Sequence, residues 1–432
     1  MTEARNRALW PLPGALLLCV LLSGSGVQAQ IKPAFQTEYR LERPTITIPF
    51  EYRQNQIVVR GQANDRKDLV FLFDTGASIP VMEKSLGLTG SHIADAQFRE
   101  AEGITRAQAI WLDDIFLFGE EGAAHVHNIA VFLADLSQIS RLLNLKIDGV
   151  LGASFMAGYV TEIDYARRVI RLHSQRTYTV MGRKPDNQRT FLFNLKPTNP
   201  LQPGGTMTIE GQLHPKYDYE FLLDTGFGGY LSVAHSAARE AGLIDDRTPR
   251  VPIVNYSVTR RFQSLKIRAS YLTVGAINLS GRVIQVDLRN NDVYGQIGII
   301  GNRMLQNYRI TMDFPRLKLW MERVTEKEEP DEAERPTLGL TIRADGRSIR
   351  VERVARYSPA QRGGVRPGDA IVAINGVDTA TMDLSQVTGL LTTPRGETVL
   401  SLQRGVDPNF GTRGAPFTVT LRPASPLDWV AE

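Results

Sequence analysis

The sequence predicts a mainly β protein in which one unit is used twice, followed by a small α+β domain. Three observations support this. A strand ending in Asp-Thr-Gly occurs twice, short β-branched and aromatic runs alternate with turn residues, and the last part of the chain has its own strands and amphipathic helix. A chain of 432 residues is also too long for one core and should divide into two to four domains.

The repeated unit is recognised by three landmarks. Residues 69–76 read Leu-Val-Phe-Leu-Phe-Asp-Thr-Gly, and residues 219–226 read Tyr-Glu-Phe-Leu-Leu-Asp-Thr-Gly, an offset of 150. Two later landmarks recur in the same order at an offset of 149: Val-Leu-Gly at 150–152 with Ile-Ile-Gly at 299–301, and Glu-Ile-Asp-Tyr at 162–165 with Thr-Met-Asp-Phe at 311–314. We therefore place the first copy at residues 30–180 and the second at residues 190–325.

Each copy should consist mostly of short strands. The runs at residues 46–48, 57–59, 206–209 and 271–274 are rich in β-branched or aromatic side chains and lie between Gly, Asn and Asp turns. One short helix is expected after each Asp-Thr-Gly strand, at residues 83–88 and 234–242. A second is expected after each apolar-apolar-Gly landmark, at residues 154–156 and 302–304.

The first 29 residues predict a secretory signal. Arg5 and Arg7 precede an apolar run at residues 8–22, and a small-residue step ends at Ala29, where cleavage is expected. The protein is therefore expected in the periplasm or outside the cell. A retained membrane anchor is the alternative, but the run is shorter than the ~20 residues that span a bilayer. A lipoprotein at Cys19 is less favoured because Leu18 stands where a small residue is wanted.

Composition excludes several classes of function. Hydrophobic residues make up 42% and charged residues 22% of the chain, as in soluble globular proteins. The net charge of +4 is small and the basic residues are scattered, so nucleic-acid binding gains no support. Cys19 is the only cysteine, so the mature chain would have no disulfide, thiol nucleophile or thiolate metal site.

The two Asp-Thr-Gly turns predict paired carboxylates. Asp74 and Asp224 each follow an apolar strand, which should deliver them to a buried site. Two carboxyl groups in contact share one proton, so the ionised group can activate water while the protonated group polarises a peptide carbonyl. Support for the loops is expected from the neighbouring small and hydroxyl residues: Thr75, Gly76, Ser78, Thr225 and Gly226.

These residues resemble the retropepsin-like and pepsin-like aspartic proteases. Phe-Leu-Phe-Asp-Thr-Gly-Ala-Ser at 71–78 matches the first loop of that family, and Asp-Gly-Val-Leu-Gly at 148–152 matches the second. The resemblance implies two retropepsin-like lobes with Asp74 and Asp224 as the catalytic pair. It also implies that Thr75 and Thr225 form the grip between lobes. The implied activity is an endopeptidase without a cofactor, acting on proteins or peptides.

The second copy departs from the family pattern, since Phe227 and Gly228 stand where the first copy has Ala77 and Ser78. Three arrangements stay open: a dyad within one chain, a dyad of two Asp74 side chains from two chains, or a lobe that has lost catalysis. The last would leave a peptide-binding or scaffolding protein. A duplication places both halves of the catalytic site in one polypeptide at a fixed effective concentration, which favours the dyad within one chain.

Two further expectations concern the site. Neither Ala77 nor Phe227 offers a hydroxyl donor to the carboxylates, and fewer donors to the charged form mean a higher pKa. We therefore predict activity at mildly acidic to neutral pH. Hairpins that cover the substrate are expected around residues 102–104 in the first lobe and 255–257 in the second.

The C-terminal part begins after an acidic stretch. Residues 326–335 carry six acidic residues and are predicted to be a solvated linker. Residues 336–424 resemble a PDZ domain of the bacterial periplasmic-protease type, because Leu338-Gly339-Leu340-Thr341 matches its carboxylate-binding loop and Gly-Val-Arg-Pro-Gly-Asp at 364–369 its most characteristic stretch. The resemblance implies a groove that binds extended peptides or C-termini as an added strand.

Two other chemistries find little support. A trypsin-like reading needs a Ser in a Gly-rich nucleophile loop with His and Asp partners, and no Ser-Gly step here has that setting. His125 and His127 would share one face of a strand, but no third ligand is evident beside them. They are therefore expected to be ordinary surface residues, and no metal site is predicted.

Overall fold

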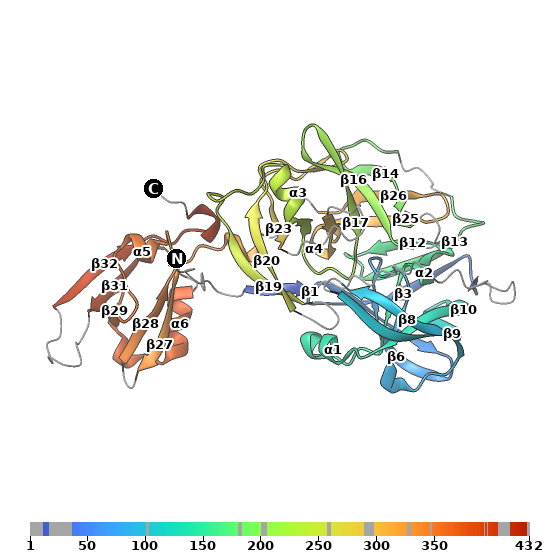
Figure 1. Ribbon diagram of the computed structural model, residues 1–432, viewed down its shortest axis with the longest axis horizontal. Helices are drawn as coiled ribbons and strands as arrows, with labels where there is room; N and C mark the ends of the chain where they lie inside the picture. Colours follow the sequence, from blue (N-terminus) through green and yellow to red (C-terminus); the bar gives the residue numbers. More distant parts are fainter. Residues whose placement is uncertain are drawn as a thin grey trace.

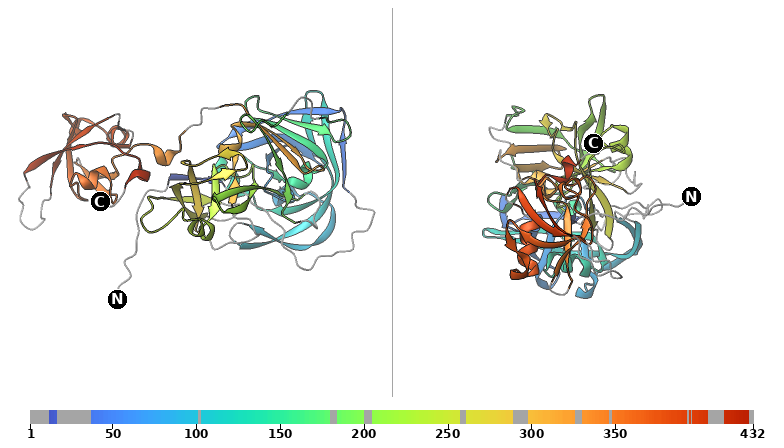
Figure 2. Two further views of the ribbon diagram at one scale, coloured as in Figure 1. Left: turned by 90° about the horizontal axis from the view of Figure 1, so that it is seen from above. Right: turned by 90° about the vertical axis from the view of Figure 1, so that its left-hand side faces the viewer.

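The computed structural model describes residues 12–16, 37–100, 103–179, 184–199, 205–256, 261–288, 298–325, 330–345, 348–392, 394, 396–404 and 415–429. Figure 1 shows two β lobes side by side and a smaller C-terminal domain set apart from them. The left-hand view in Figure 2 shows the same separation. The mainly β fold class with two similar lobes and a small α+β domain is confirmed.

The first lobe is a nine-stranded sheet in the order β2-β10-β7-β11-β6-β5-β9-β8, with β4 paired to β5. Because β10 also pairs with β9, the sheet closes on itself. Its strands are β2 (Glu38–Leu41), β4 (Glu51–Arg53), β5 (Gln56–Ala63), β6 (Arg66–Phe73), β7 (Val81–Glu83), β8 (Ser91–Glu100), β9 (Gly103–Gly119), β10 (Gly122–Ala134) and β11 (Gly149–Leu151).

The second lobe repeats the central arrangement of the first. β17 pairs antiparallel with β16 and parallel with β24, as β6 does with β5 and β11. This shared topology supports a duplicated unit. The strands are β15 (Lys196–Pro197), β16 (Met207–His214), β17 (Tyr217–Leu223), β18 (Leu231–Ala234), β19 (Val251–Tyr256), β20 (Arg261–Arg268), β21 (Thr273–Val274), β22 (Ile277–Asn278), β23 (Val283–Asp287) and β24 (Gly298–Ile300).

A six-stranded sheet joins the two lobes. Its order is β14-β26-β25-β12-β13-β3, and the antiparallel pairing of β12 with β25 crosses from one lobe to the other. In Figure 1 this sheet lies between the lobes. Its strands are β3 (Thr45–Pro49), β12 (Tyr159–Asp164), β13 (Val169–Ser174), β14 (Thr190–Asn194), β25 (Tyr308–Asp313) and β26 (Lys318–Arg323).

The short helices follow the sequence prediction closely. After the Asp-Thr-Gly strands come η2 (Lys84–Leu86), a 3-10 turn, and α3 (His235–Glu240). After the Gly landmarks come α2 (Ala153–Met156) and α4 (Asn302–Leu305). The helix α1 (Ser137–Leu143) of the first lobe was not predicted.

The C-terminal domain is a sheet in the order β27-β28-β29-β31-β32, with β30 paired to β29. β27 therefore lies at one edge, and the helix α6 contacts it. The elements are β27 (Leu340–Asp345), β28 (Ser348–Val354), α5 (Pro359–Arg362), β29 (Ala370–Ile374), β30 (Val377–Asp378), η4 (Thr379–Thr381), α6 (Leu384–Thr392), β31 (Thr398–Gln403), β32 (Pro416–Leu421) and η5 (Pro426–Asp428).

Little of the expected signal segment is described. Residues Leu12–Leu16 form β1, which pairs in parallel with β19, so that Leu12 lies opposite Ile253. Across the described ranges, we find no helix with the length and apolar character that crossing a bilayer requires.

The acidic linker is less solvated than its composition predicts. Its described part contains η3 (Glu332–Glu334), whose N-cap is Asp331. Asp331 is only 8% exposed and forms ion pairs with Lys266 at 2.7 Å and Arg303 at 2.8 Å, both from the second lobe. Burial by itself would raise the pKa of Asp331, but Lys266 and then Arg303 hold it below its usual value. The prediction of a solvated linker is therefore wrong for this part, because lobe residues distant in sequence neutralise the acid.

Replacing Asp331 by Ala is expected to lower the free energy of unfolding by about 3–5 kcal/mol, because it leaves the buried ammonium of Lys266 without its partner. Urea denaturation followed by fluorescence measures this loss. Glu332→Ala is the matched control, since its side chain lies next in the chain and forms no ion pair among the contacts that the structure describes. Equal losses in the two variants would contradict a specific role for the ion pairs of Asp331.

Candidate active site

The two Asp-Thr-Gly turns meet at the interface of the lobes. Asp74 directly follows β6 and Asp224 directly follows β17. The N–H of Asp74 donates to the carbonyl of Leu151 at 3.0 Å, and the N–H of Asp224 donates to that of Ile300 at 3.0 Å. Both aspartates have no exposed surface. The apolar-apolar-Gly landmarks therefore act as the neighbouring strands that hold each Asp turn in place.

Reciprocal hydrogen bonds join the two turns. The hydroxyl of Thr75 donates to the carbonyl of Leu223 at 2.8 Å, and the hydroxyl of Thr225 donates to that of Phe73 at 2.7 Å. Each hydroxyl oxygen also accepts the N–H of the opposite Thr, at 3.0 and 3.1 Å. These four bonds form the inter-lobe grip that the family resemblance implies, and they are buried.

The glycines of the turns let the carboxyl groups approach. A Cβ placed on Gly76 would overlap the carboxyl group of Asp224, and one placed on Gly226 would overlap that of Asp74. Each carboxylate thus lies directly against the turn of the other lobe. The N–H of Gly76 donates to Oδ1 of Asp74 at 2.7 Å, and the N–H of Gly226 donates to Oδ1 of Asp224 at 2.8 Å.

Burial and the opposite carboxylate both act on Asp74. Its removal from water, and then the negative charge of Asp224, raise the pKa of Asp74 well above its usual range. The N–H groups of Gly76 and Ala77 oppose this change by donating to the charged form. This pair of acids is therefore arranged to retain a proton above the pH at which an isolated Asp loses it.

The departure at Phe227 is accommodated inside the second lobe. Its side chain is fully buried and packs with Leu222 and Phe262, so it belongs to a small core. Its carbonyl accepts the N–H of Asn302 at 2.8 Å, as the carbonyl of Ala77 accepts that of Ala153 at 2.6 Å. This backbone contact is thus present in both turns, while the N–H of Phe227 donates to the carbonyl of Asp224 at 3.2 Å. Ser78 is also buried, and its carbonyl accepts the N–H of Ser154.

Three supporting residues were missed at the level of sequence. Gln56 donates its side-chain N–H to the carbonyl of Gly226 at 3.0 Å and is 1% exposed. Asn302 donates to the carbonyl of Asn55 at 2.8 Å and accepts the hydroxyl of Tyr165 at 2.6 Å. All three connect one lobe to the other. A signal existed for two of them, because Asn302 follows the Gly landmark and Tyr165 ends the third landmark.

Both predicted covering hairpins lie where strands reverse. In the first lobe, Gly103 begins β9 and β8 ends just before it; residues 101–102 lie outside the described ranges. In the second lobe, Asn255 and Tyr256 end β19, and Ser257 is likewise outside. Tyr256 packs against the apolar cluster of the first lobe. The second hairpin therefore reaches across the lobe interface, while the turn of the first is not described.

The predicted carboxylate-binding loop lies at the start of the edge strand β27. Leu338 and Leu340 are buried in the core of the small domain, and Gly339 has a φ of 75°, a conformation that suits glycine. The N–H of Gly339 donates weakly to the hydroxyl of Thr337 at 3.3 Å, and Thr341 continues into β27. The loop therefore leads directly into the edge strand β27, which α6 contacts.

The structure also places a third side chain of metal-ligating type, which the sequence did not show, beside His125 and His127. Asp114 lies between them, and within the described part of the chain these three are the residues grouped closely enough to hold a metal ion. One feature of the sequence could have indicated this contact. The turn at residues 119–122 fixes the register of β9 against β10 and so places Asp114 opposite His127.

Comparison with known proteins supports the assignment of the small domain. Residues 350–404 match the PDZ domain family. No curated protein matches the chain. Among solved structures, the chain is similar to the basic 7S globulin from soybean, with 10% identity and a TM-score of 0.36 over 64% of this chain and 94% of that one. The C-terminal domain is thus a PDZ domain, which implies that it binds peptides.

Proposed function

We propose that the chain is an exported aspartic endopeptidase whose catalytic dyad, Asp74 and Asp224, forms within one polypeptide. The observation that carries this proposal is the reciprocal bonding of Thr75 and Thr225, which holds the two carboxyl groups against each other in one buried site. A site assembled from two chains is not needed to bring the carboxyl groups together. The expected signal segment at residues 1–29 is the basis for export.

The chemistry follows from one proton shared by two carboxyl groups. The ionised group takes a proton from water, whose oxygen attacks the carbonyl carbon of the peptide bond, while the protonated group donates to the carbonyl oxygen. As the tetrahedral intermediate collapses, its hydroxyl returns a proton to the second carboxyl group, the C–N bond breaks, and the leaving nitrogen takes the proton that the first carboxyl group removed from water. Gly76 and Gly226 hold one oxygen of each carboxyl group through their N–H groups, which orients the other oxygen for proton transfer.

The substrate would bind as an extended strand. The outer edge of β19 pairs with β1 in parallel, so this edge is able to accept an added segment of chain. Tyr256 at the end of β19 reaches the apolar cluster of the first lobe, which places this edge beside the lobe interface. Removal of the signal segment would leave the edge open to a substrate.

The PDZ domain would bind a second stretch of peptide. β27 is an edge strand with α6 against it, and the loop of Leu338, Gly339, Leu340 and Thr341 precedes it, so a C-terminus could add to the sheet with its carboxylate at the loop. We propose that this groove holds protein substrates or their C-termini near the peptidase lobes.

The test of peptidase function is the rate of cleavage of an unfolded, labelled protein between pH 3 and pH 8. We expect cleavage with an optimum in the mildly acidic to neutral range. Burial and Asp224 raise the pKa of Asp74, so the singly protonated dyad persists to higher pH than an isolated carboxyl group with a pKa of about 3.9 would allow. An optimum below about pH 3 would contradict the pH argument, and absence of cleavage at every pH would refute the peptidase proposal.

A further inference from the structure

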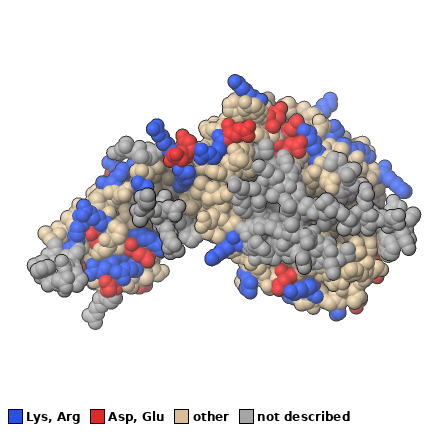
Figure 3. Space-filling model, in the orientation of Figure 1, with Lys and Arg blue, Asp and Glu red and all other residues tan. Residues whose placement is uncertain are grey.

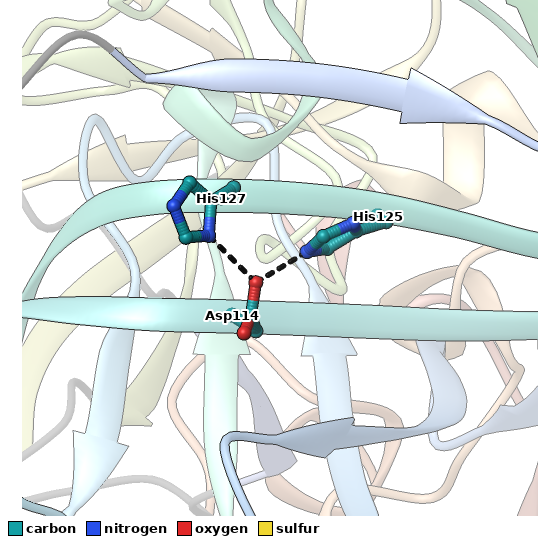
Figure 4. Close-up of side chains that lie close together, drawn as sticks. All are labelled: Asp114, His125 and His127. Atoms are coloured by element: carbon teal, nitrogen blue, oxygen red, sulfur yellow. Dashed lines mark hydrogen bonds and ion pairs between the residues drawn. The ribbon is translucent and has the colours of Figure 1, made fainter.

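The β9–β10 hairpin brings two imidazoles to one carboxylate. His125 and His127 lie two residues apart on β10 and therefore share a face, and Asp114 lies directly opposite His127 on β9. Figure 4 shows both rings turned toward the carboxylate. Oδ1 of Asp114 is 2.8 Å from Nδ1 of His127 and also forms a short contact with Nε2 of His125.

This cluster is accessible and already well ordered by its neighbours. The side chains of His125, His127 and Asp114 are 19%, 35% and 31% exposed, so an ion from solution can reach them. Phe116 stacks on the ring of His125 with centroids 4.2 Å apart. The N–H of Asn64 donates to the carbonyl of Asp114 at 2.9 Å, and the N–H of Asp114 donates to Oδ1 of Asn64 at 3.0 Å. The ligand atoms thus need little ordering when an ion binds.

The donor set has the chemistry of a zinc site. The three ligand atoms lie within 4.8 Å of one another, and Zn²⁺ is bound by imidazole nitrogen and carboxylate oxygen at about 2.0–2.2 Å. An ion placed among them would replace the hydrogen bonds to Asp114. We propose that Asp114, His125 and His127 bind a Zn²⁺ ion. This site is separate from the Asp74–Asp224 dyad, and peptide hydrolysis by the dyad does not require it.

A fourth protein ligand is available on the next strand. Glu38 on β2 lies directly opposite His127, so Asp114, His127 and Glu38 form a row across three strands. Glu38 now pairs with Arg40 at 2.5 Å, on an exposed surface where such a pair is weak. Glu38 can therefore turn to the ion at little cost, and the ion would then tie β2, β10 and β9 together.

The test is calorimetric titration of the full chain with ZnCl₂, with Cys19 replaced by Ser in every sample so that its thiol binds no metal. We expect one Zn²⁺ per chain. We expect the affinity for Zn²⁺ to fall by at least about tenfold in each of three variants, His125→Ala, His127→Ala and Asp114→Asn. Removing a residue that only orients a metal ligand already lowers affinity by about tenfold, and removing the ligand itself should cost no less. Glu38→Ala should lower it less. Circular dichroism checks that each variant is folded.

The matched control is His214→Ala, which removes a half-buried imidazole from the second lobe. It should bind Zn²⁺ as the parent does. Co²⁺ gives a second readout, because a tetrahedral site with nitrogen and oxygen ligands produces visible absorption that the three ligand variants should lose. Zn²⁺ binding that is equal in parent and ligand variants, or no binding by the parent, would overturn the proposal. Neither outcome bears on the dyad, which is tested by cleavage.

Discussion

Replacement of Asp74 or Asp224 by Asn is expected to lower kcat/KM for peptide cleavage by about 10²- to 10⁴-fold, the range that a positioned acid or base contributes. Asn retains the size of the side chain but can neither take a proton from water nor share one with the other carboxyl group. Each variant is measured with the same labelled unfolded protein at the pH optimum of the parent. Asp218→Asn is the matched control, since Asp218 lies exposed on β17, the strand that Asp224 directly follows, and should retain full activity.

The pattern of loss separates the arrangements of the site. A loss in both variants is the expected result for a dyad within one chain. A loss in Asp74→Asn alone would contradict it and indicate two Asp74 side chains from two chains. Full activity in both variants would refute any role for these carboxylates in cleavage.

Replacement of Gly226 by Ala is expected to lower the rate of cleavage by about 10²-fold, because small misplacements of reacting groups cost that much. The added Cβ would overlap the carboxyl group of Asp74, and the lobes or the carboxylate must move to make room. Gly76→Ala should behave alike, since its Cβ would overlap Asp224. The measurements are the cleavage rate and the thermal midpoint of unfolding.

The control for this prediction is Gly389→Ala. Gly389 lies in α6 of the PDZ domain with no atom near the position of an added Cβ, and Ala favours a helix over Gly by about 1 kcal/mol. This variant should keep its activity and become slightly more stable. Unchanged cleavage by Gly226→Ala would show that the two turns do not approach as closely as the structure has them.

The parts of the site that repeat could be predicted from the sequence. Asp74, Thr75 and Gly76 recur 150 residues later, and an internal repeat reveals both the lobes and the residues that each lobe brings to their interface. The same repeat made Phe227 a departure from the first copy, which has Ala77 at this position. An alignment of the two copies does not show where a side chain packs. In the folded chain Phe227 turns into a core of its own lobe.

Features that depend on distant partners could not be predicted. The sequence around Asp331 predicted a solvated acidic run. Its partners Lys266 and Arg303 are distant in sequence and become its neighbours only when the second lobe folds. Asp114 was overlooked beside His125 and His127 since eleven or more residues separate them, although the tight turn of the hairpin sets their register. In both cases the contacts join residues that are distant in sequence, so the local composition of a segment does not reveal them.

The pairing of β12 with β25 has a consequence for the history of the chain. Glu162 lies opposite Thr311, its counterpart in the other copy, and the pairs on either side are related by exchange of the copies: Val160 meets Asp313, and Asp164 meets Arg309. This is the geometry of a twofold axis between identical subunits. An ancestral chain of one lobe could have formed the same sheet as a homodimer. Such a fusion would allow each half to diverge: in this chain the first lobe has two histidines facing an aspartate, and the second lobe forms the ion pairs with Asp331. Figure 3 shows the charged side chains on one face of the molecule, where acidic side chains gather unevenly among scattered basic ones.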